Sequence, residues 1–204
     1  MGKLLAYYKQ DGAVNTIKFI LSAITAPIYK KSETEFVKID LKRDWNTLAI
    51  DGFQFRKMEL SELDGLDFPR LKSQPYKKWF EIGSELYVGF YNNQPATYSW
   101  IHYAYHDMGV LGKFILNNGE CWIGPTFVDN KFRGKGLNKA QMLFNFRDAR
   151  AEIGFGSFNS QNTASKVSCL KVGFIIYGKA IVKSLFGHKK IQIEGELLKE
   201  HLKS

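Results

Sequence analysis

The sequence is poor in the features of secreted, metal-binding and membrane-spanning proteins. Its two cysteines, Cys121 and Cys169, lie far apart and form no CxxC or Cys/His spacing, which argues against a disulfide framework and a zinc site. The apolar run at 19–28 is about half of the roughly 20 residues that a spanning helix needs. No internal repeat or low-complexity linker is visible. We therefore expect a soluble, cytoplasmic protein that holds no metal ion.

The composition is that of a folded, basic protein. Of the 204 residues, 45% are hydrophobic and 15% are aromatic, which is ample for a core. The net charge of +9 is concentrated toward the two ends, with +3 in residues 1–44, +1 in 45–162 and +5 in 163–204. Such a positive charge suggests nucleic acid, anionic membranes and phosphorylated ligands as possible classes of partner, although it says little about the fold.

The hydrophobic pattern predicts strands mixed with helices. Residues 13–26 have the period of an amphipathic helix, which either docks on the domain or lies at a membrane interface. We expect turns at 92–95 and 117–119 and a bulge at Gly124-Pro125. The expected strands are 35–41, 53–58, 86–91, 96–105, 120–128, 155–160, 174–182 and 191–193. Three helices are expected. The first begins at Leu137 and has a periodic pattern up to Ile153, the second covers 164–172, and the third is a short tail after Gly195.

A basic, glycine-bearing turn, Arg133-Gly134-Lys135-Gly136-Leu137-Asn138, follows the strand that ends at Val128. Where a helix begins after such a turn, its first N–H groups have no intrahelical acceptor and attract phosphate. A Walker A loop is excluded because no Ser or Thr follows the Gly-Lys pair. The dinucleotide fingerprint is excluded because Lys139 stands at its third glycine position. The turn is therefore an anion site of another type.

Together with a second block, this turn resembles the signature of the GNAT superfamily of acyl-CoA-dependent N-acyltransferases. The signature is Arg/Gln-x-x-Gly-x-Gly/Ala, and here it runs from Arg133 to Asn138, with Asn138 in place of the last Gly or Ala. The second block is Asn162-x-x-Ser165 followed by the run 170–174, which ends in Gly-Phe.

The resemblance covers roughly residues 53–194. It implies an α+β fold with a central mixed, mainly antiparallel sheet, flanked by helices and splayed between its fourth and fifth core strands. Residues 1–52 are expected to form an N-terminal extension packed on the core, and residues 53–204 the acyltransferase domain.

The resemblance also implies that acetyl-CoA, or another acyl-CoA, is the co-substrate. The CoA pyrophosphate would bind the N–H groups of the turn, and pantetheine would insert beside the bulged strand. A main-chain N–H within 126–128 would polarise the thioester carbonyl. On this basis the residues expected to bind the co-substrate are Thr126, Phe127, Val128, Arg133, Gly134, Lys135, Gly136, Leu137, Asn138, Asn162 and Ser165.

Acyl transfer to an amine also needs an acid for the leaving thiolate and, where the amine is charged, a base. The superfamily often uses a Tyr seven residues after the helix Asn as the acid, and Cys169 occupies that position here, with Tyr177 as the other candidate. Glu120, His102 and His106 are candidates for the base. Each of these residues also has an ordinary structural interpretation, as a buried thiol, a turn charge or a packed ring.

The predicted function is transfer of an acetyl or other short acyl group from acyl-CoA to a primary amine, by direct attack in a ternary complex. Aromatic residues within 76–105 suit stacking on a sugar ring, so an amino sugar is one candidate acceptor. A monomer or a homodimer is expected. Two alternatives stay open. One is a basic binding protein for nucleic acid or an anionic membrane, with nucleic acid the less favoured partner, and the other is a GNAT fold that binds CoA without catalysis.

Overall fold

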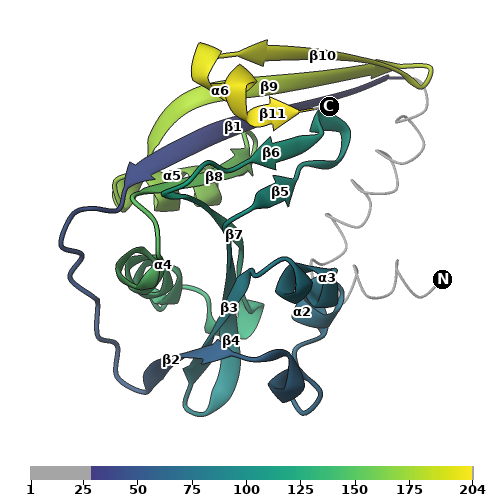
Figure 1. The fold of residues 1–204 in the computed structure, drawn as a ribbon. Helices are drawn as coiled ribbons and strands as arrows, with labels where there is room; N and C mark the ends of the chain where they lie inside the picture. The colour runs from purple at the N-terminus through teal and green to yellow at the C-terminus, as the bar shows by residue number, and fades with distance from the viewer. Residues whose placement is uncertain (1–28, 204) are drawn as a thin grey trace.

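The strands within residues 29–203 form two sheets. The computed structural model describes residues 29–203. The strands of the larger sheet are β1 Tyr29–Asp40, β2 Phe53–Met58, β3 Glu85–Tyr91, β4 Gln94–His102, β7 Glu120–Val128, β8 Ile153–Asn159, β9 Ile175–Leu185 and β10 His188–Glu194. Those of the smaller sheet are β5 Tyr105–Asp107, β6 Lys113–Ile115 and β11 Leu202–Lys203. The strand orders are β10-β9-β1-β8-β7-β4-β3-β2 and β11-β6-β5 (Figure 1). In the larger sheet neighbours pair antiparallel except β7 and β8, so the predicted mixed, mainly antiparallel sheet is confirmed.

Helices flank both faces of the larger sheet. They are α2 Pro69–Lys72, α3 Tyr76–Glu81, α4 Leu137–Asp148, α5 Thr163–Lys171 and α6 Glu196–His201, with short 3-10 turns η1 Leu60–Leu63, η2 Gly109–Leu111 and η3 Asn130–Phe132. On one face, Met142 of α4 and Cys169 of α5 belong to one core cluster. Leu71 of α2 and Leu198 of α6 belong to two further clusters. The helix expected at 13–26 lies outside the described residues.

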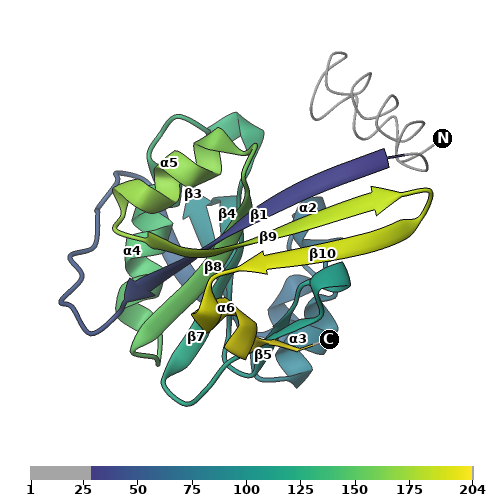
Figure 2. The ribbon, with the colours of Figure 1, turned by 90° about the horizontal axis from the view of Figure 1, so that it is seen from above.

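Strand β1 runs through the larger sheet between β8 and β9 (Figure 2). It begins at Tyr29, earlier than the strand predicted at 35–41. It pairs with β8 over residues 34–40 and with β9 over residues 29–38. Phe36 near its middle is fully buried, with its ring centre 6.2 Å from that of Phe114. This strand therefore contributes to the main core, while the domain boundary expected at residue 52 stays a prediction.

The hairpin of β3 and β4 forms, but its turn is shorter than the one predicted at 92–95 and its second strand ends earlier than predicted. Asn92 and Asn93 have φ values of 48° and 62°, which is the two-residue hairpin turn that Asn tolerates. Strand β4 then starts at Gln94. The strand expected to reach Tyr105 ends at His102, because Tyr105 begins β5 and pairs with β6 in the smaller sheet.

The helical pattern predicted up to Ile153 is wrong in its last turn. Helix α4 ends at Asp148. The N–H groups of Glu152 and Ile153 both donate to the carbonyl of Gly119, at 2.7 and 3.1 Å, and this begins β8 beside β7. Strand pairing therefore overrides a helical period that continues in the sequence.

Strands β7 and β8 separate soon after they meet. Their parallel pairing joins only residues 120–122 to residues 153–155. Beyond it, Gly124 and Pro125 together stand opposite the single residue Trp100 of β4, which is the predicted bulge. The splay expected between the fourth and fifth core strands is thus confirmed, and it opens toward the start of α4.

Candidate active site

The turn before α4 leaves a row of backbone N–H groups free. Asp129 accepts a hydrogen bond from the N–H of Lys131 at 2.9 Å, which shapes the short turn η3. Gly134 and Gly136 then have φ values of 79° and 76°, where a side chain would be strained. Among the described residues, the N–H groups from Gly134 to Asn138 have no hydrogen-bond acceptor. They lie at the N-terminus of a 12-residue helix, where the macrodipole is positive.

A cavity of about 670 Å³ lies beside this row. Within residues 29–203, the charged side chains that line it are Arg70 of α2 and Arg133 of the turn, and no carboxylate does. Arg70 also places its guanidinium 5.7 Å from the ring centre of Phe127 in the same wall. Two guanidinium groups and a row of free N–H groups make this cavity, named here the anion cavity, suited to a phosphate or diphosphate.

The departure from the GNAT signature at Asn138 has a structural explanation. Its Nδ2 donates to Ser168 Oγ at 2.7 Å, so the side chain ties the start of α4 to α5. Asn162 caps α5 by accepting from the N–H of Ser165 at 3.0 Å. Since Asn138, Asn162 and Ser165 all line the anion cavity, its wall on this side is held by hydrogen bonds.

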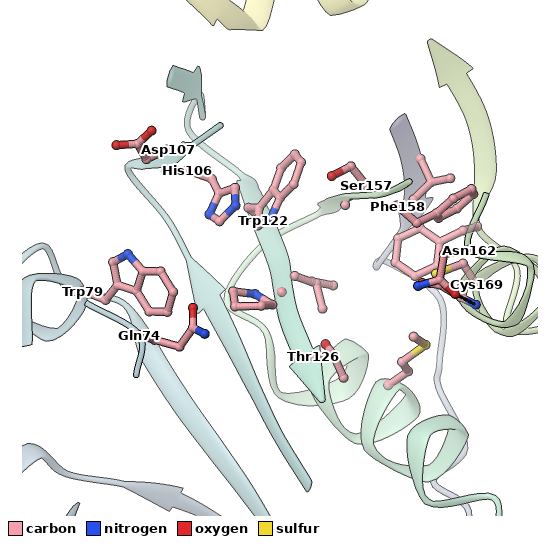
Figure 3. A pocket seen from close by; sticks show the side chains of 18 residues that line it. Gln74, Trp79, His106, Asp107, Trp122, Thr126, Ser157, Phe158, Asn162 and Cys169 are labelled. Carbon is pink, nitrogen blue, oxygen red and sulfur yellow. Dashed lines mark hydrogen bonds between the residues drawn. The ribbon is translucent and has the colours of Figure 1, made fainter. Parts of the chain in front are cut away.

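A second cavity of about 440 Å³ occupies the splay between β7 and β8 (Figure 3). Four residues, Thr126, Met142, Asn162 and Ser165, line both cavities, so the two spaces adjoin. The other residues that line this splay cavity are Val37, Gln74, Trp79, His106, Asp107, Trp122, Ile123, Gly124, Pro125, Gly156, Ser157, Phe158, Cys169 and Phe174. They come from both sides of β7, and Figure 3 shows Cys169 and Asn162 on one side and His106, Asp107 and Trp79 on the other. The opening therefore passes from the anion cavity through the sheet.

Beyond its pairing with β8, strand β7 presents two backbone N–H groups to the splay, while the Val128 carbonyl accepts a hydrogen bond from Arg133 Nε at 3.5 Å. The N–H of Asp129 donates to the carbonyl of Ala96 at 2.8 Å. Because antiparallel hydrogen bonds alternate along a strand, Phe127 faces β4 as well, and the N–H groups of Thr126 and Val128 point the other way. On that side β8 has already diverged. These two N–H groups therefore face the splay.

A buried polar chain holds Thr126 in place. Asn145 Nδ2 donates to Ser99 Oγ at 2.7 Å, and Ser99 Oγ lies 2.9 Å from Thr126 Oγ1. Asn145 and Ser99 are fully buried. Hydrogen bonds inside the protein are strong and directional, so this chain of three side chains fixes the rim where the two cavities meet.

Two adjacent histidine rings, those of His102 and His106, lie on the side of the splay cavity away from Cys169. The ring centres of His102 and His106 are 5.0 Å apart, and His106 stacks on Trp122 at 4.7 Å. His102 is fully buried, and its Nδ1 lies 2.7 Å from Ser84 Oγ, with which it shares a hydrogen bond. Burial lowers the pKa of His106 to about 4, against a smaller opposing effect of Asp107, so its ring is neutral at pH 7. Of this pair, only His106 lines the cavity.

Most residues expected to bind the co-substrate meet at the anion cavity. Those that line it are Thr126, Phe127, Val128, Arg133, Gly134, Gly136, Leu137, Asn138, Asn162 and Ser165. Lys135 does not line it, and its Nζ lies 5.1 Å from the ring centre of Tyr91. Two sequence blocks that are separate along the chain are therefore brought to one wall.

The candidate catalytic residues are not brought together. Cys169 lines the splay cavity, and burial raises its pKa to about 11. Glu120 lines neither cavity, and one of its carboxylate oxygens lies 3.1 Å from Nε2 of His201. Tyr177 also lines neither cavity and packs against Phe155, where burial raises the pKa of its phenol. His102 is enclosed behind His106.

Several lining residues had no signal in the sequence. Arg70 and Gln74 belong to a segment broken by two prolines, which has no recognisable functional spacing. Trp79, in the same segment, is different, because it lies within the aromatic stretch 76–105 that is expected to suit a sugar ring, and it lines the splay cavity. Asp107 belongs to β5, which the sequence did not separate from β4. Their approach to the site depends on how α2, α3 and β5 pack against the sheet, which local patterns do not specify.

Solved structures share the fold of this chain. No family model and no curated protein matches the sequence. A functionally unknown conserved protein from Staphylococcus epidermidis is 16% identical with a TM-score of 0.54, over 87% of this chain and 67% of its own. A tandem GNAT protein from the clavulanic acid biosynthesis pathway is 14% identical with a TM-score of 0.57, over 85% and 59%. A GCN5-related N-acetyltransferase from Sphaerobacter thermophilus is 13% identical with a TM-score of 0.55, over 91% and 59%.

These likenesses, with the splayed sheet, define the class: the chain has the fold of the GNAT acetyltransferases. It spans only 59% of the length of the second and third of these structures. Within residues 29–203, no helix is long and apolar enough to cross a membrane, and no cluster of His, Cys, Asp or Glu is arranged to hold a metal ion.

His102 leads to a prediction about pH. Burial, and then the neighbouring His106, lowers its pKa from the ordinary 6.5 to about 3, with a smaller opposing effect of the Gly124 carbonyl. Between those values the unfolded chain binds a proton that the folded protein does not. The free energy of unfolding therefore rises with pH from about 3 to 6.5, and this contribution is complete above 6.5. Lowering the pH from 7 to 4.5 should remove about 3 kcal/mol through this one group.

The measurement is urea unfolding of the wild type and His102→Gln at both pH values. Because other groups titrate in both proteins, the difference between the two proteins isolates His102. We expect that difference to shrink by about 3 kcal/mol at the lower pH. An equal loss in both proteins would contradict the prediction.

Proposed function

We propose that the protein is an acyl-CoA-dependent N-acyltransferase that moves an acetyl or other short acyl group to a primary amine by direct attack in a ternary complex. The observation that carries the proposal is one continuous opening, from the free N–H row at 134–138 through the splay to His106. A diphosphate-bearing donor and a separate acceptor could approach each other through it from opposite sides of β7. A cytoplasmic location, where acyl-CoA is present, belongs to the proposal.

The residues of the anion cavity suit CoA. The N–H groups from Gly134 to Asn138 would bind the pyrophosphate, with Arg133 and Arg70 supplying charge. Glycine at 134 and 136 allows the backbone to approach the phosphates closely. The unpaired edge of β7 would accept the pantetheine amides as an added strand would.

The edge of β7 also suits polarisation of a carbonyl. When bound, acyl-CoA would supply a thioester as the acyl donor. The N–H groups of Thr126 and Val128 face the splay, and such fixed dipoles stabilise charge that develops on oxygen. The Asn145–Ser99–Thr126 chain keeps this edge in place, so little reorganisation is needed.

In this proposal Cys169 donates a hydrogen bond to the leaving group and His106 is the general base. The thiol of Cys169, with a pKa of about 11, stays protonated at neutral pH and can donate a hydrogen bond toward a leaving thiolate. The neutral ring of His106 can take a proton from an attacking amine. Since its pKa is about 4, the charged ring would readily give that proton to water or to the CoA thiolate that is released when the C–S bond breaks. Glu120 and Tyr177 have no role here, because neither lines a cavity.

The acceptor would enter beside Trp79, Gln74 and Asp107. Among the residues that the structure describes, Asp107 places a carboxylate in the wall of the splay cavity and no Lys or Arg lines it, which favours a neutral or cationic amine over a phosphate-linked one. Trp79 gives an aromatic surface for a sugar ring or an aliphatic chain. A small amine, with an unphosphorylated amino sugar as one candidate, is therefore the proposed acceptor.

The donor half of the proposal is tested by thermal unfolding with acetyl-CoA. Binding only to the folded state stabilises it by about 2.7 kcal/mol at a hundredfold excess over Kd, which for a chain of this size raises Tm by roughly 5–10 °C. Arg133→Glu combined with Gly136→Asp should abolish the rise. Arg147→Glu, an exposed charge reversal on α4 outside the cavity, should leave it intact. No rise with acetyl-CoA or any other short acyl-CoA would refute the proposal.

The chemistry is tested by mass spectrometry of acyl-CoA turnover over a panel of primary amines. We expect His106→Gln to lower kcat about a hundredfold, the low end for a general base because its pKa is low. Cys169→Ser should lower kcat while leaving the acetyl-CoA-induced rise in Tm unchanged.

The matched controls are His188→Gln, at an exposed hairpin residue, and Cys121→Ser, at the other buried thiol. Both should keep wild-type kcat. Turnover unaffected by the first two substitutions would remove these residues from the mechanism. Acetyl-CoA binding without turnover of any amine would favour the catalytically silent alternative.

A further inference from the structure

The hairpin of β9 and β10 projects from the body of the protein together with the start of β1 (Figure 2). Its end is apolar and exposed: Tyr29, Leu185 and Phe186 are 51, 54 and 71% exposed. Tyr29 pairs with Leu185, and Leu185 pairs with His188, so these side chains form one cross-strand row. We name 185–188 with Tyr29 the hairpin tip.

Directly behind the tip, three lysines form the next row on the same face. Lys31 pairs with Lys183, and Lys183 pairs with Lys190. Like charges directly opposite each other in a sheet are destabilising. Glu33 lies 3.5 Å from Lys31, but its other oxygen lies 2.7 Å from Lys179. Within residues 29–203, Lys183 and Lys190 have no ion-pair partner, so an external anion would relieve this row.

The tip carries a bulky residue where the backbone disfavours one. Phe186 and Gly187 have φ values of 46° and 82°, the two-residue hairpin turn that strongly prefers Asn-Gly. The equivalent turn of β3 and β4 uses Asn92 and Asn93. Because Phe186 is 71% exposed, packing does not explain why an aromatic ring occupies a left-handed position. An outlier of this kind points to a role outside the fold.

We propose that the hairpin tip docks on an anionic phospholipid surface. Phe186 and Leu185 enter the boundary between headgroups and acyl chains, and Lys31, Lys183 and Lys190 bind the lipid phosphates. The apolar residues stand at the leading end and the lysines one row behind them. When the tip enters a bilayer, the apolar side chains therefore reach the acyl boundary while the lysines remain at the level of the headgroup phosphates. Lys30 and Lys189 pair with Ser184 on the opposite face and add positive charge there.

Two other occupants fit these observations less well. Nucleic acid presents its phosphates outermost, so a binding surface for it would place lysines rather than Leu185 and Phe186 at the leading end. A second copy of the chain could pair with the exposed edge of β10, but lysines on an edge strand disfavour such pairing. In Figure 2 helices α4 and α5 lie at the other end of the sheet, so docking leaves the anion cavity open to the donor.

The test is flotation of the full chain with vesicles of phosphatidylcholine alone or mixed with phosphatidylglycerol. We expect binding to the mixed vesicles only, and release at high salt. Lys183→Gln with Lys190→Gln should weaken binding by roughly 25-fold, about fivefold for each lysine. Lys77→Gln with Lys78→Gln, the same change at two exposed lysines of α3, should leave it unchanged.

Phe186→Asn separates binding from folding. It supplies the residue that the turn prefers, so Tm should be maintained or raised, while vesicle binding should fall on the order of tenfold or more. Ile175→Ser, at a 57% exposed residue near the other end of β9, is the apolar control and should bind normally. Acyl transfer measured without vesicles should be the same in all these variants.

Three outcomes would overturn the proposal. One is no flotation of the wild type with the mixed vesicles. Another is flotation that the tip and lysine-row substitutions leave unchanged, which would assign it to another part of the chain. The third is retention on single-stranded DNA that these substitutions abolish, in a protein that does not float, which would make the surface a nucleic-acid site.

Discussion

The pairing between β7 and β8 stops after three residue pairs, and the candidate active site depends on that early end. A parallel sheet normally continues to hydrogen-bond along the full length of its strands. Here the chain leaves a strand edge free inside the molecule, which is costly unless something else occupies it. In the proposed function, the amide groups of pantetheine would occupy it. The splay therefore links the fold to the proposed chemistry.

Each of the two separating strands is held on its other side, so the gap is built in. Strand β7 pairs with β4, and the bulge at Gly124-Pro125 turns its last residues away from β8. Strand β8 pairs with β1 along its whole length. Where the strands are still close, Gly154 and Gly156 face Ile123, and a Cβ at 154 would lie 2.9 Å from that side chain. Small residues thus allow contact at the base of the splay.

The two ends of the opening carry opposite charges. Arg70 and Arg133 line the end beside the free N–H row, and Asp107 lines the other. An anionic donor and a neutral or cationic amine would therefore be drawn to different ends. His106, neutral in its buried position, lies on the side of β7 proposed for the amine.

Local sequence patterns predicted much of this fold. The turn from Arg133 to Asn138 and the Gly124-Pro125 bulge depend on neighbouring residues, and each is found. The end of α4 was missed because the helical period continues past Asp148 and only pairing with β7 ends it.

The acceptor side could not be predicted in the same way. Gln74 and Asp107 reach the splay cavity from separate parts of the chain, and their positions follow from packing over the sheet. Arg70, at the donor end, reaches the anion cavity in the same way. Glu120 and Tyr177 have chemically suitable side chains, but register and strand direction place them away from both cavities. Chemical type along a strand does not by itself determine which space a side chain reaches.

The most direct test of the account is hydrogen–deuterium exchange with and without CoA. The N–H groups from Gly134 to Asn138, and those of Thr126 and Val128, should donate hydrogen bonds to bound CoA. CoA should slow exchange in the peptides that contain 126–128 and 134–138 and leave those of β10 unchanged. Unchanged exchange at both segments under saturating CoA would contradict the account.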